Sequence, residues 1–479
     1  MDAASNDASD SPPPTGRKAP VRPDLTTGPI GRTLLLFSLP VLGANVLQSV
    51  NGSANAAIVS HVLGEAALAA VYSANLILFL VLGAGFGATM AANLMIGQAF
   101  GSKNLTLAKE VVGTATTFFA VVSLGMGLFG FLAAPTVLDM VQTPPDVRAD
   151  AIAYLRIVFV SVPFMFFFTF LMMAMRAVGD SRTPFWFSLI SVILGVGLNP
   201  LLILGVGPLP RLGIMGSGVA TLIAQAITLA AMIYYLHRTE SLLVLKREDW
   251  RLLSPDWSLV RALVAKGFPM GIQMIVMSSS AVVMIGLVNK YGSHMAAAYG
   301  AANQFWVYVQ MPAMALGASV SSMAAINVGA GRMDRVTRIA WVGSITGCIA
   351  TALPIVVIYL FEPWLMRLFL PAASPATPLA LHINTIVLWG FIPFGITFVL
   401  TSVVRATGAV WAPLIGMTIG MWVVRVPFAA ALAPWMGANS IWWSFPFGAL
   451  ASAIFAFSFY RWGGWRKSKL FETRADVTP

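Results

Sequence analysis

Long apolar stretches alternate with short polar segments along almost the whole chain. The core of a bilayer is about 30 Å thick, so a helix that crosses it needs about 20 apolar residues. By this criterion of length, the sequence predicts twelve membrane-spanning helices. Several exceed the minimum length, which implies tilt or protruding ends. The expected ranges are 33–60, 66–97, 108–134, 150–175, 183–206, 212–237, 260–289, 294–327, 336–361, 378–404, 410–434 and 441–462.

The composition agrees with this pattern. Of the 479 residues, 58% are hydrophobic and 10% are charged, with a mean hydropathy of +0.81. A soluble protein carries about 25% charged residues. The 42 glycines and 29 prolines also fit, because neighbouring membrane helices satisfy the backbone groups that such residues free. We therefore expect an all-α, multi-pass integral membrane protein.

Lysine and arginine are distributed unevenly among the connecting segments. If the N-terminus lies in the cytoplasm, twenty-three of the twenty-nine fall on the cytoplasmic side, as the positive-inside rule favours. The net charge of +11 is then a topology signal and requires no nucleic-acid partner. Both termini are expected in the cytoplasm. The first 24 residues are rich in Asp, Ser and Pro without an apolar core, which predicts a disordered tail rather than a signal peptide.

The most charged stretch between the predicted spans is 239–258. We interpret it as a cytoplasmic linker between an N-lobe of six helices, 25–238, and a C-lobe of six helices, 259–465. A disordered tail, 1–24, and a basic cytoplasmic tail, 466–479, complete the predicted organisation.

Motifs recur in the two halves at offsets of 228 to 230 residues. The matched pairs are Pro40 with Pro269, Gly64 with Gly292, Asn75 with Asn303, Gly87 with Gly317, and Arg176 with Arg405. Because each half has an even number of spans, both halves enter the membrane from the same side. Such a parallel repeat, related by an axis along the membrane normal, is typical of transporters with alternating access.

Several motifs carry a family resemblance. They are "NAAIVSHVLGEAALAAV" at the end of the first span, "GQAFGSKN" and "NVGAGRMDR" at paired positions, the R-x-x-G turns, and "VRVP" at 424–427. In order and spacing the chain resembles the multidrug and toxic compound extrusion (MATE) transporters, NorM- and DinF-like members of the MOP flippase superfamily, from about residue 30 to 462. The resemblance implies twelve helices in two pseudo-symmetric six-helix lobes. It also implies export of organic, often cationic, compounds driven by H⁺ or Na⁺.

The chain departs from the family pattern at the intramembrane acids. Many relatives carry an aspartate in the first helix and another in the fifth, where this chain has Asn55 and Asn199. Pro40 corresponds to the proline at which relatives bend the first helix, and Pro269 is its repeat partner. His61 closes the first span. A carboxylate can exchange a proton, whereas an amide cannot.

The coupling ion therefore stays open between three hypotheses. The eighteen acidic residues lie in tails, loops or helix ends, and the glutamate that some relatives have in the seventh helix is Met277 here. In the first hypothesis, histidines such as His61 carry the protons, because histidine is the side-chain type that changes charge near neutral pH. Alternatively, neutral oxygens hold Na⁺, or coupling is weak or absent. The oxygens considered are those of Asn51, Asn55, Asn199 and Thr221. We expect no cofactor or metal beyond Na⁺ or H⁺.

Polar residues in both halves are candidates for a substrate cavity. Gln48, Asn51 and Asn55 share one helix face, which fits either a wet cavity or hydrogen bonds between helices. Arg425 is a charge well inside a predicted span, where a cation is costly and by default functional or paired. The complete set is Gln48, Asn51, Asn55, Asn199, Thr221, Gln273, Asn303, Trp306 and Arg425.

We expect a secondary active exporter of small amphipathic compounds in a bacterial-type inner membrane, and not an enzyme. Its partners are small organic substrates and the bilayer, with no nucleic acid, and a monomer fits. A flippase for lipid-linked or polysaccharide precursors is the alternative within the superfamily. A membrane-embedded enzyme would need a polar catalytic cluster on one membrane face, which the sequence does not present.

Overall fold

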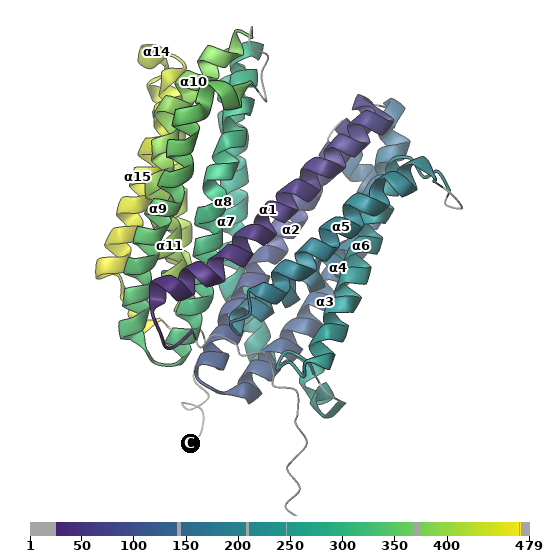
Figure 1. The fold of residues 1–479 in the computed structure, drawn as a ribbon, viewed down its shortest axis with the longest axis vertical. Coiled ribbons are helices and arrows are strands. Elements are labelled where there is room, and N and C mark those ends of the chain that lie inside the picture. The colour runs from purple at the N-terminus through teal and green to yellow at the C-terminus, as the bar shows by residue number, and fades with distance from the viewer. Residues whose placement is uncertain are drawn as a thin grey trace, which may run out of the picture.

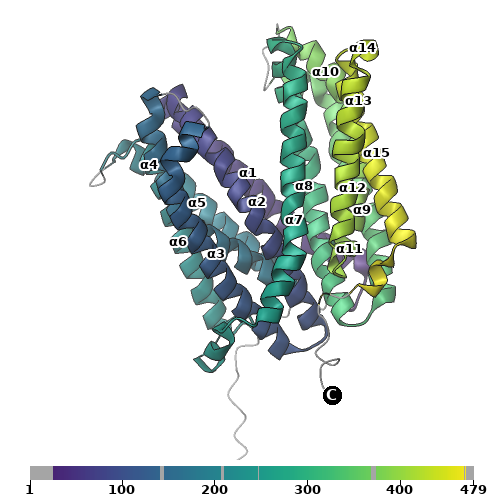
Figure 2. The same ribbon diagram turned by 180° about the vertical axis from the view of Figure 1, so that it is seen from behind.

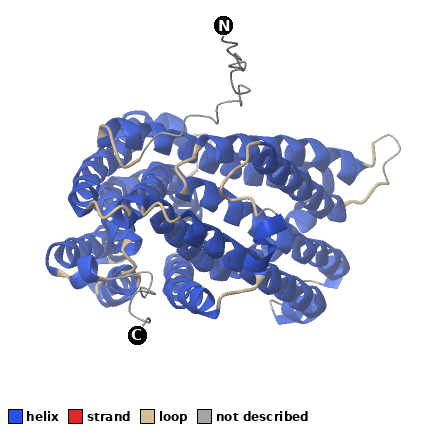
Figure 3. Ribbon diagram, turned by 90° about the horizontal axis from the view of Figure 1, so that it is seen from below, coloured by secondary structure: helices blue, strands red, loops and turns tan. Residues whose placement is uncertain are grey.

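Helices make up all regular structure in the described part of the chain (Figure 3). The structure is a computed structural model that describes residues 25–140, 145–206, 210–245, 247–367, 374–468 and 470. The expected tail 1–24 and most of the expected tail 466–479 lie outside these ranges. The first six helices are α1 (Ile30–Leu63), α2 (Glu65–Gly101), α3 (Leu105–Met140), α4 (Pro145–Ala177), α5 (Arg182–Leu204) and α6 (Ile214–Arg238).

The second half begins after a short 3₁₀ helix, η1 (Arg247–Leu253), in the predicted linker. It continues with α7 (Trp257–Asn289), α8 (Ser293–Gly329), α9 (Met333–Met366), α10 (Ala376–Val387), α11 (Phe391–Ala406), α12 (Trp411–Thr418), α13 (Val426–Ala431), α14 (Ala433–Met436) and α15 (Asn439–Trp462). In Figures 1 and 2 the helices α1–α6 and α7–α15 form two bundles that meet at the lower end and diverge upwards.

Each predicted span falls on a helix. Eleven segments of the described chain are long and apolar enough to cross a membrane, and α2 accounts for the remaining prediction. The tenth span is a composite of α10, a 3₁₀ turn at Leu388–Gly390 and α11. The eleventh joins α12 to α13 through a π-helical segment, η3 (Ile419–Arg425). The predicted all-α fold of twelve membrane helices is therefore confirmed.

Local backbone conformation supports the repeat. Gly64 and Gly292 separate the first two helices of each half and have φ of 87° and 92°. Gly179 and Gly408 lie at the paired R-x-x-G turns with φ of 87° and 97°. L-residues with a side chain rarely adopt this left-handed region, so glycine suits both copies of each turn. Pro40 and Pro269 both lie inside uninterrupted helices, and a bend at these prolines stays a prediction.

The two bundles pack together where α2 contacts α7 and α8 and where α1 contacts α8, and the α2–α8 crossing is the tightest of these at the lower end. A Cβ atom on Gly101 would lie 1.9 Å from the backbone oxygen of Ile326, and one on Gly329 would lie 2.0 Å from that of Gln98. Only glycine permits so close an approach of two helix backbones. The side-chain amide of Gln98 also donates to the backbone oxygen of Ala406 at 2.7 Å. Small residues thus close the lower end of the molecule.

Candidate functional site

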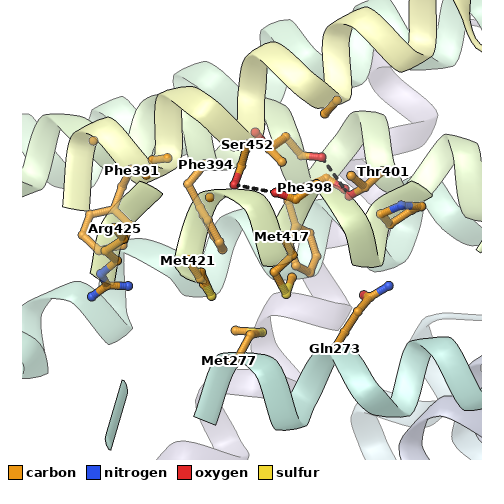
Figure 4. A pocket seen from close by; sticks show the side chains of 18 of the residues that line it. Gln273, Met277, Phe391, Phe394, Phe398, Thr401, Met417, Met421, Arg425 and Ser452 are labelled. Carbon is orange, nitrogen blue, oxygen red and sulfur yellow. Dashed lines mark hydrogen bonds between the residues drawn. The ribbon is translucent and has the colours of Figure 1, made fainter. Parts of the chain in front are cut away.

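A cavity of about 230 Å³ lies within the second half of the chain. We call it the C-lobe cavity; α7, α8, α10, the 3₁₀ turn at Leu388–Gly390, α11, α12, η3 and α15 contribute its walls. Figure 4 shows Gln273 and Met277 on α7 facing Met417 and Met421 across it. The polar and charged lining residues are Gln273, Asn303, Gln310, Thr397, Thr401, Arg405, Arg425 and Ser452.

Two irregular helical segments shape this cavity. Pro427 has no N–H to donate, and η3 ends two residues before it, where a proline disturbs the preceding turn. π-helical segments are frequent at functional sites. Gly420 and Gly448 let η3 approach α15, since a Cβ on Gly448 would lie 2.7 Å from the backbone oxygen of Gly420. The result places Arg425 at the cavity wall.

One face of α11 supplies an aromatic wall. Phe391, Phe394 and Phe398 follow one another at spacings of three and four, so they share a helix face. The ring centroids are 6.1 Å apart between Phe391 and Phe394 and 5.7 Å apart between Phe394 and Phe398. Methionine side chains on the opposite wall can adapt to irregular shapes and contact aromatic rings favourably. This lining fits a flat, largely apolar compound.

The charges on the cavity wall are both positive. The guanidinium of Arg425 lies 3.3 Å from the ring centroid of Phe445. Arg405 donates to Gln273 Oε1 at 3.3 Å and to Ser402 Oγ at 2.9 Å. Among the described residues that line the cavity, none is acidic. The electrostatic potential of the lining therefore favours neutral or negative groups.

The predicted C-lobe residues come together at this cavity. Gln273, Asn303, Trp306 and Arg425 all line it. Trp306 is buried and donates from Nε1 to Asn384 Oδ1 at 2.9 Å. Arg405 was not among the predicted cavity residues, because the distribution of basic residues placed it at a cytoplasmic helix end. Its place in a repeated R-x-x-G motif at an apolar span was the available signal.

The predicted N-lobe amides form a separate, neutral cluster. Asn55 Oδ1 accepts hydrogen bonds from Asn199 Nδ2 and, at 2.7 Å, from Ser217 Oγ. The buried side chain of Tyr154 on α4 lies beside this cluster. Thr221 instead donates to the backbone oxygen of Ser217 at 3.1 Å. Three helices, α1, α5 and α6, are thereby joined through Asn55.

The other residues of the predicted amide stripe have different surroundings. Gln48 lines a smaller cavity of about 140 Å³ together with the buried Arg176. Asn51 Oδ1 faces Gly195 of α5, where it would lie 3.2 Å from an added Cβ atom. His61 is exposed near the end of α1, and its Nδ1 lies 2.8 Å from the backbone oxygen of Ala57. The stripe thus divides between packing contacts and a small cavity.

Glu362 is an acid whose burial the sequence did not reveal. It lies near the end of α9, as expected, but its side chain is buried. It lies near Asn384, the residue whose Oδ1 accepts from Trp306 on the cavity wall. Glu362 Oε1 and Asn384 Nδ2 are both buried without a hydrogen-bond partner in the described chain. Within the same ranges, no group of His, Cys, Asp and Glu side chains is arranged to hold a metal ion.

Twelve membrane helices in two repeated halves, with an apolar cavity inside one of them, define a multi-pass membrane transporter. A family model described as MatE matches residues 40–201 and again 269–431, so the chain belongs to the MATE family. The two matches begin at Pro40 and Pro269, which the repeat had paired.

Individual relatives agree with this assignment. The probable multidrug resistance protein YoeA of Bacillus subtilis is 34% identical over 443 residues, which cover 92% of this chain and 95% of that protein. The FAD transporter of Shewanella oneidensis is 28% identical over 370 residues, 76% of each chain. A solved structure of a MOP superfamily transporter from Pyrococcus furiosus superimposes with a TM-score of 0.84 at 17% identity, covering 91% of this chain and 96% of that one. Family and relatives support multidrug efflux as the function.

Proposed function

We propose that this protein is a secondary active exporter of small amphipathic organic compounds that alternates access between its two lobes. The observation that carries the proposal is the C-lobe cavity, in which an aromatic face of α11 opposes methionines of α7 and η3. Ligand sites of this kind are concave, mostly apolar and furnished with a few polar groups. The relatives are named for more than one substrate class, so we infer the substrate class of this protein from its cavity lining instead.

Alternating access needs an interface between lobes that can separate. The α2–α8 crossing supports this, since glycines of both helices allow a close backbone contact there. Smooth contacts of this type suit a rocking motion of one repeat against the other. We place the crossing at the cytoplasmic end, with both termini on that side of a bacterial inner membrane.

For energy coupling we propose antiport with H⁺ or Na⁺ that does not depend on proton exchange at Asn55. An amide cannot titrate, and both hydrogen bonds that Asn55 Oδ1 accepts come from protein groups. Glu362 adds a carboxyl group to the candidates, because it is buried near Asn384, which accepts a hydrogen bond from Trp306 on the cavity wall. Weak coupling remains the competing hypothesis.

The alternative functions have less support. A flippase of polysaccharide precursors needs a strongly charged passage for a large headgroup, whereas most of the C-lobe cavity is apolar. A membrane-embedded enzyme needs nucleophilic or acid–base groups within reach of one another. The lining residues supply amides, hydroxyls and guanidinium groups without such a pair.

Filling the cavity tests the proposal. Ala281 lines it on α7, so Ala281→Trp should block binding and abolish efflux of a fluorescent amphipathic dye from efflux-deficient bacteria. Ala297→Trp is the matched control, because Ala297 is exposed on α8 outside the lining. Equal membrane levels are checked on blots. If the wild type exports no dye from a chemically diverse panel, or if both variants export alike, the proposed role of the cavity is wrong.

A further inference from the structure

We infer that the C-lobe cavity binds an amphipathic aromatic anion, with the acidic group of the ligand on Arg425 and its ring system against the phenylalanines of α11. This inference rests on the proposed function only in taking the cavity as the substrate site. It adds the charge of the substrate and the residue that selects it.

Arg425 is placed as an anion receptor. One face of its guanidinium is covered by Phe445 at 3.3 Å from the ring centroid, which orients the group as stacked arginines are. Its Nε is buried and has no hydrogen-bond partner within the described chain. No acidic residue of that part of the protein forms an ion pair with it. A cation within a membrane-spanning segment and without a carboxylate partner is costly, and a bound anion would offset this cost.

The contrast with Arg148 shows what this chain does with a paired arginine. Arg148, at an exposed helix end, makes two hydrogen bonds to Asp139, at 2.7 and 2.9 Å. The fork of donors on Arg425 has no such partner, although it borders a cavity large enough for a small aromatic molecule. A carboxylate, sulfonate or phosphate group matches this fork geometrically. The open position at Arg425 therefore suits a ligand group rather than a protein side chain.

The rest of the lining extends the same preference. Arg405 adds a second positive charge, oriented by Gln273 and Ser402, at the end of α11 beyond Phe398. An aromatic ring held among Phe391, Phe394 and Phe398 would occupy the space between the two arginines. A cationic ligand in this position would meet two like charges and no acid, at the low dielectric of a membrane protein interior. The cavity thus discriminates by charge as well as by shape.

Binding of three probes that share one ring tests the inference. The probes are 2-naphthalenesulfonate, 2-naphthalenemethanol and 2-naphthylmethylammonium, titrated by calorimetry into purified protein in phosphatidylcholine nanodiscs, with empty discs subtracted. We expect the sulfonate to bind roughly tenfold or more tightly than the ammonium probe, as one charge-assisted hydrogen-bonded contact provides. Equal or tighter binding of the ammonium probe, or no binding of any probe, would overturn the inference.

Variants assign the preference to Arg425. Arg425→Gln should remove most of the preference for the sulfonate, whereas Arg425→Lys should keep part of it. Both should still bind the neutral alcohol, which shows that the cavity is folded. The matched control is Arg156→Gln, which removes a membrane arginine lying 5.1 Å from the ring of Phe131, outside the C-lobe cavity. An unchanged preference in Arg425→Gln would contradict the assignment.

Two further comparisons distinguish a free aromatic anion from a lipid headgroup, and binding from export. Discs that contain phosphatidylglycerol test a lipid headgroup as the occupant: unchanged sulfonate affinity supports a free aromatic anion, and strong competition by the lipid refutes it. Because binding is measured without transport, the outcome is independent of efflux. Anion binding without export would refute only the proposed function, and export of cations without anion preference would refute only this inference.

Discussion

Asn55 joins three helices through its side-chain oxygen, which accepts hydrogen bonds from Asn199 on α5 and Ser217 on α6. The cluster is neutral and internally paired apart from Asn199 Oδ1, which is buried without a partner. The C-lobe cavity differs, since its two arginines, the buried Arg405 and the half-buried Arg425, have no acidic partner in the described chain. The neutral amide cluster around Asn55 and the pair of arginines at the C-lobe cavity are therefore chemically different polar sites.

The amide at Asn55 can be tested by substitution. Asn55→Asp introduces a group that exchanges protons at nearly the same shape, so dye efflux should become more dependent on an imposed pH gradient. Asn55→Ala removes two hydrogen bonds of about 0.6 to 2 kcal/mol each and should reduce transport while leaving the pH response flat. Efflux is measured for the three proteins across a series of pH gradients. A wild type with steep proton coupling that Asn55→Ala leaves intact would place the proton path elsewhere, with Glu362 the next residue to substitute.

At the level of the helices, sequence periodicity and length predicted every membrane span, but not the irregular segments within them. Hydrophobicity reports burial in lipid, whereas η3 depends on how Pro427 and the Gly420–Gly448 contact act together. Arg405 was missed for a related reason. A helix that extends past an assumed membrane boundary, as α11 does, carries a terminal charge into the protein interior.

The α2–α8 crossing leads to a prediction for Gly329. Gly329→Ala places a methyl group about 2.0 Å from the backbone oxygen of Gln98, so the helices must move apart. We expect a loss of about 1 to 3 kcal/mol in the stability of this closed arrangement, typical of overpacking, seen as a lower midpoint in thermal unfolding. Gly300→Ala on the same helix is the control, because no atom lies within 4 Å of its added Cβ. An equal response of the two variants would show that the crossing does not depend on the glycine.

For the whole molecule, the duplicated sequence predicted the two-lobed architecture. Paired positions such as Gly64 with Gly292 have nearly the same backbone conformation, and the family model matches the chain twice. The difference in cavity size between the two lobes was not predictable from the repeat. The N-lobe position paired with Arg405 is Arg176, which lines only the smaller cavity. Which lobe holds a larger cavity depends on side-chain packing and helix irregularities that a repeat pattern does not encode.

The orientation in the membrane is predicted by the distribution of basic residues. Ser254 and Ser293 are exposed at opposite ends of α7, a helix of 33 residues. In a Cys348→Ser background, an impermeant thiol reagent added to intact cells should label Ser293→Cys and not Ser254→Cys. Labelling after membrane permeabilisation confirms that both cysteines react. Labelling of both from the outside would contradict the arrangement of two times six helices with cytoplasmic termini.

Transport by the purified protein in liposomes tests the central claim most directly. Wild type and Ala281→Trp are reconstituted, and the movement of aromatic anionic, neutral and cationic dyes is followed under imposed H⁺ and Na⁺ gradients. We predict that the wild type moves amphipathic dyes, and moves anionic dyes faster than cationic dyes of equal ring size. A gradient of H⁺ or Na⁺ should accelerate this movement, and Ala281→Trp should abolish it. Transport that is the same in wild type, Ala281→Trp and protein-free liposomes would contradict it.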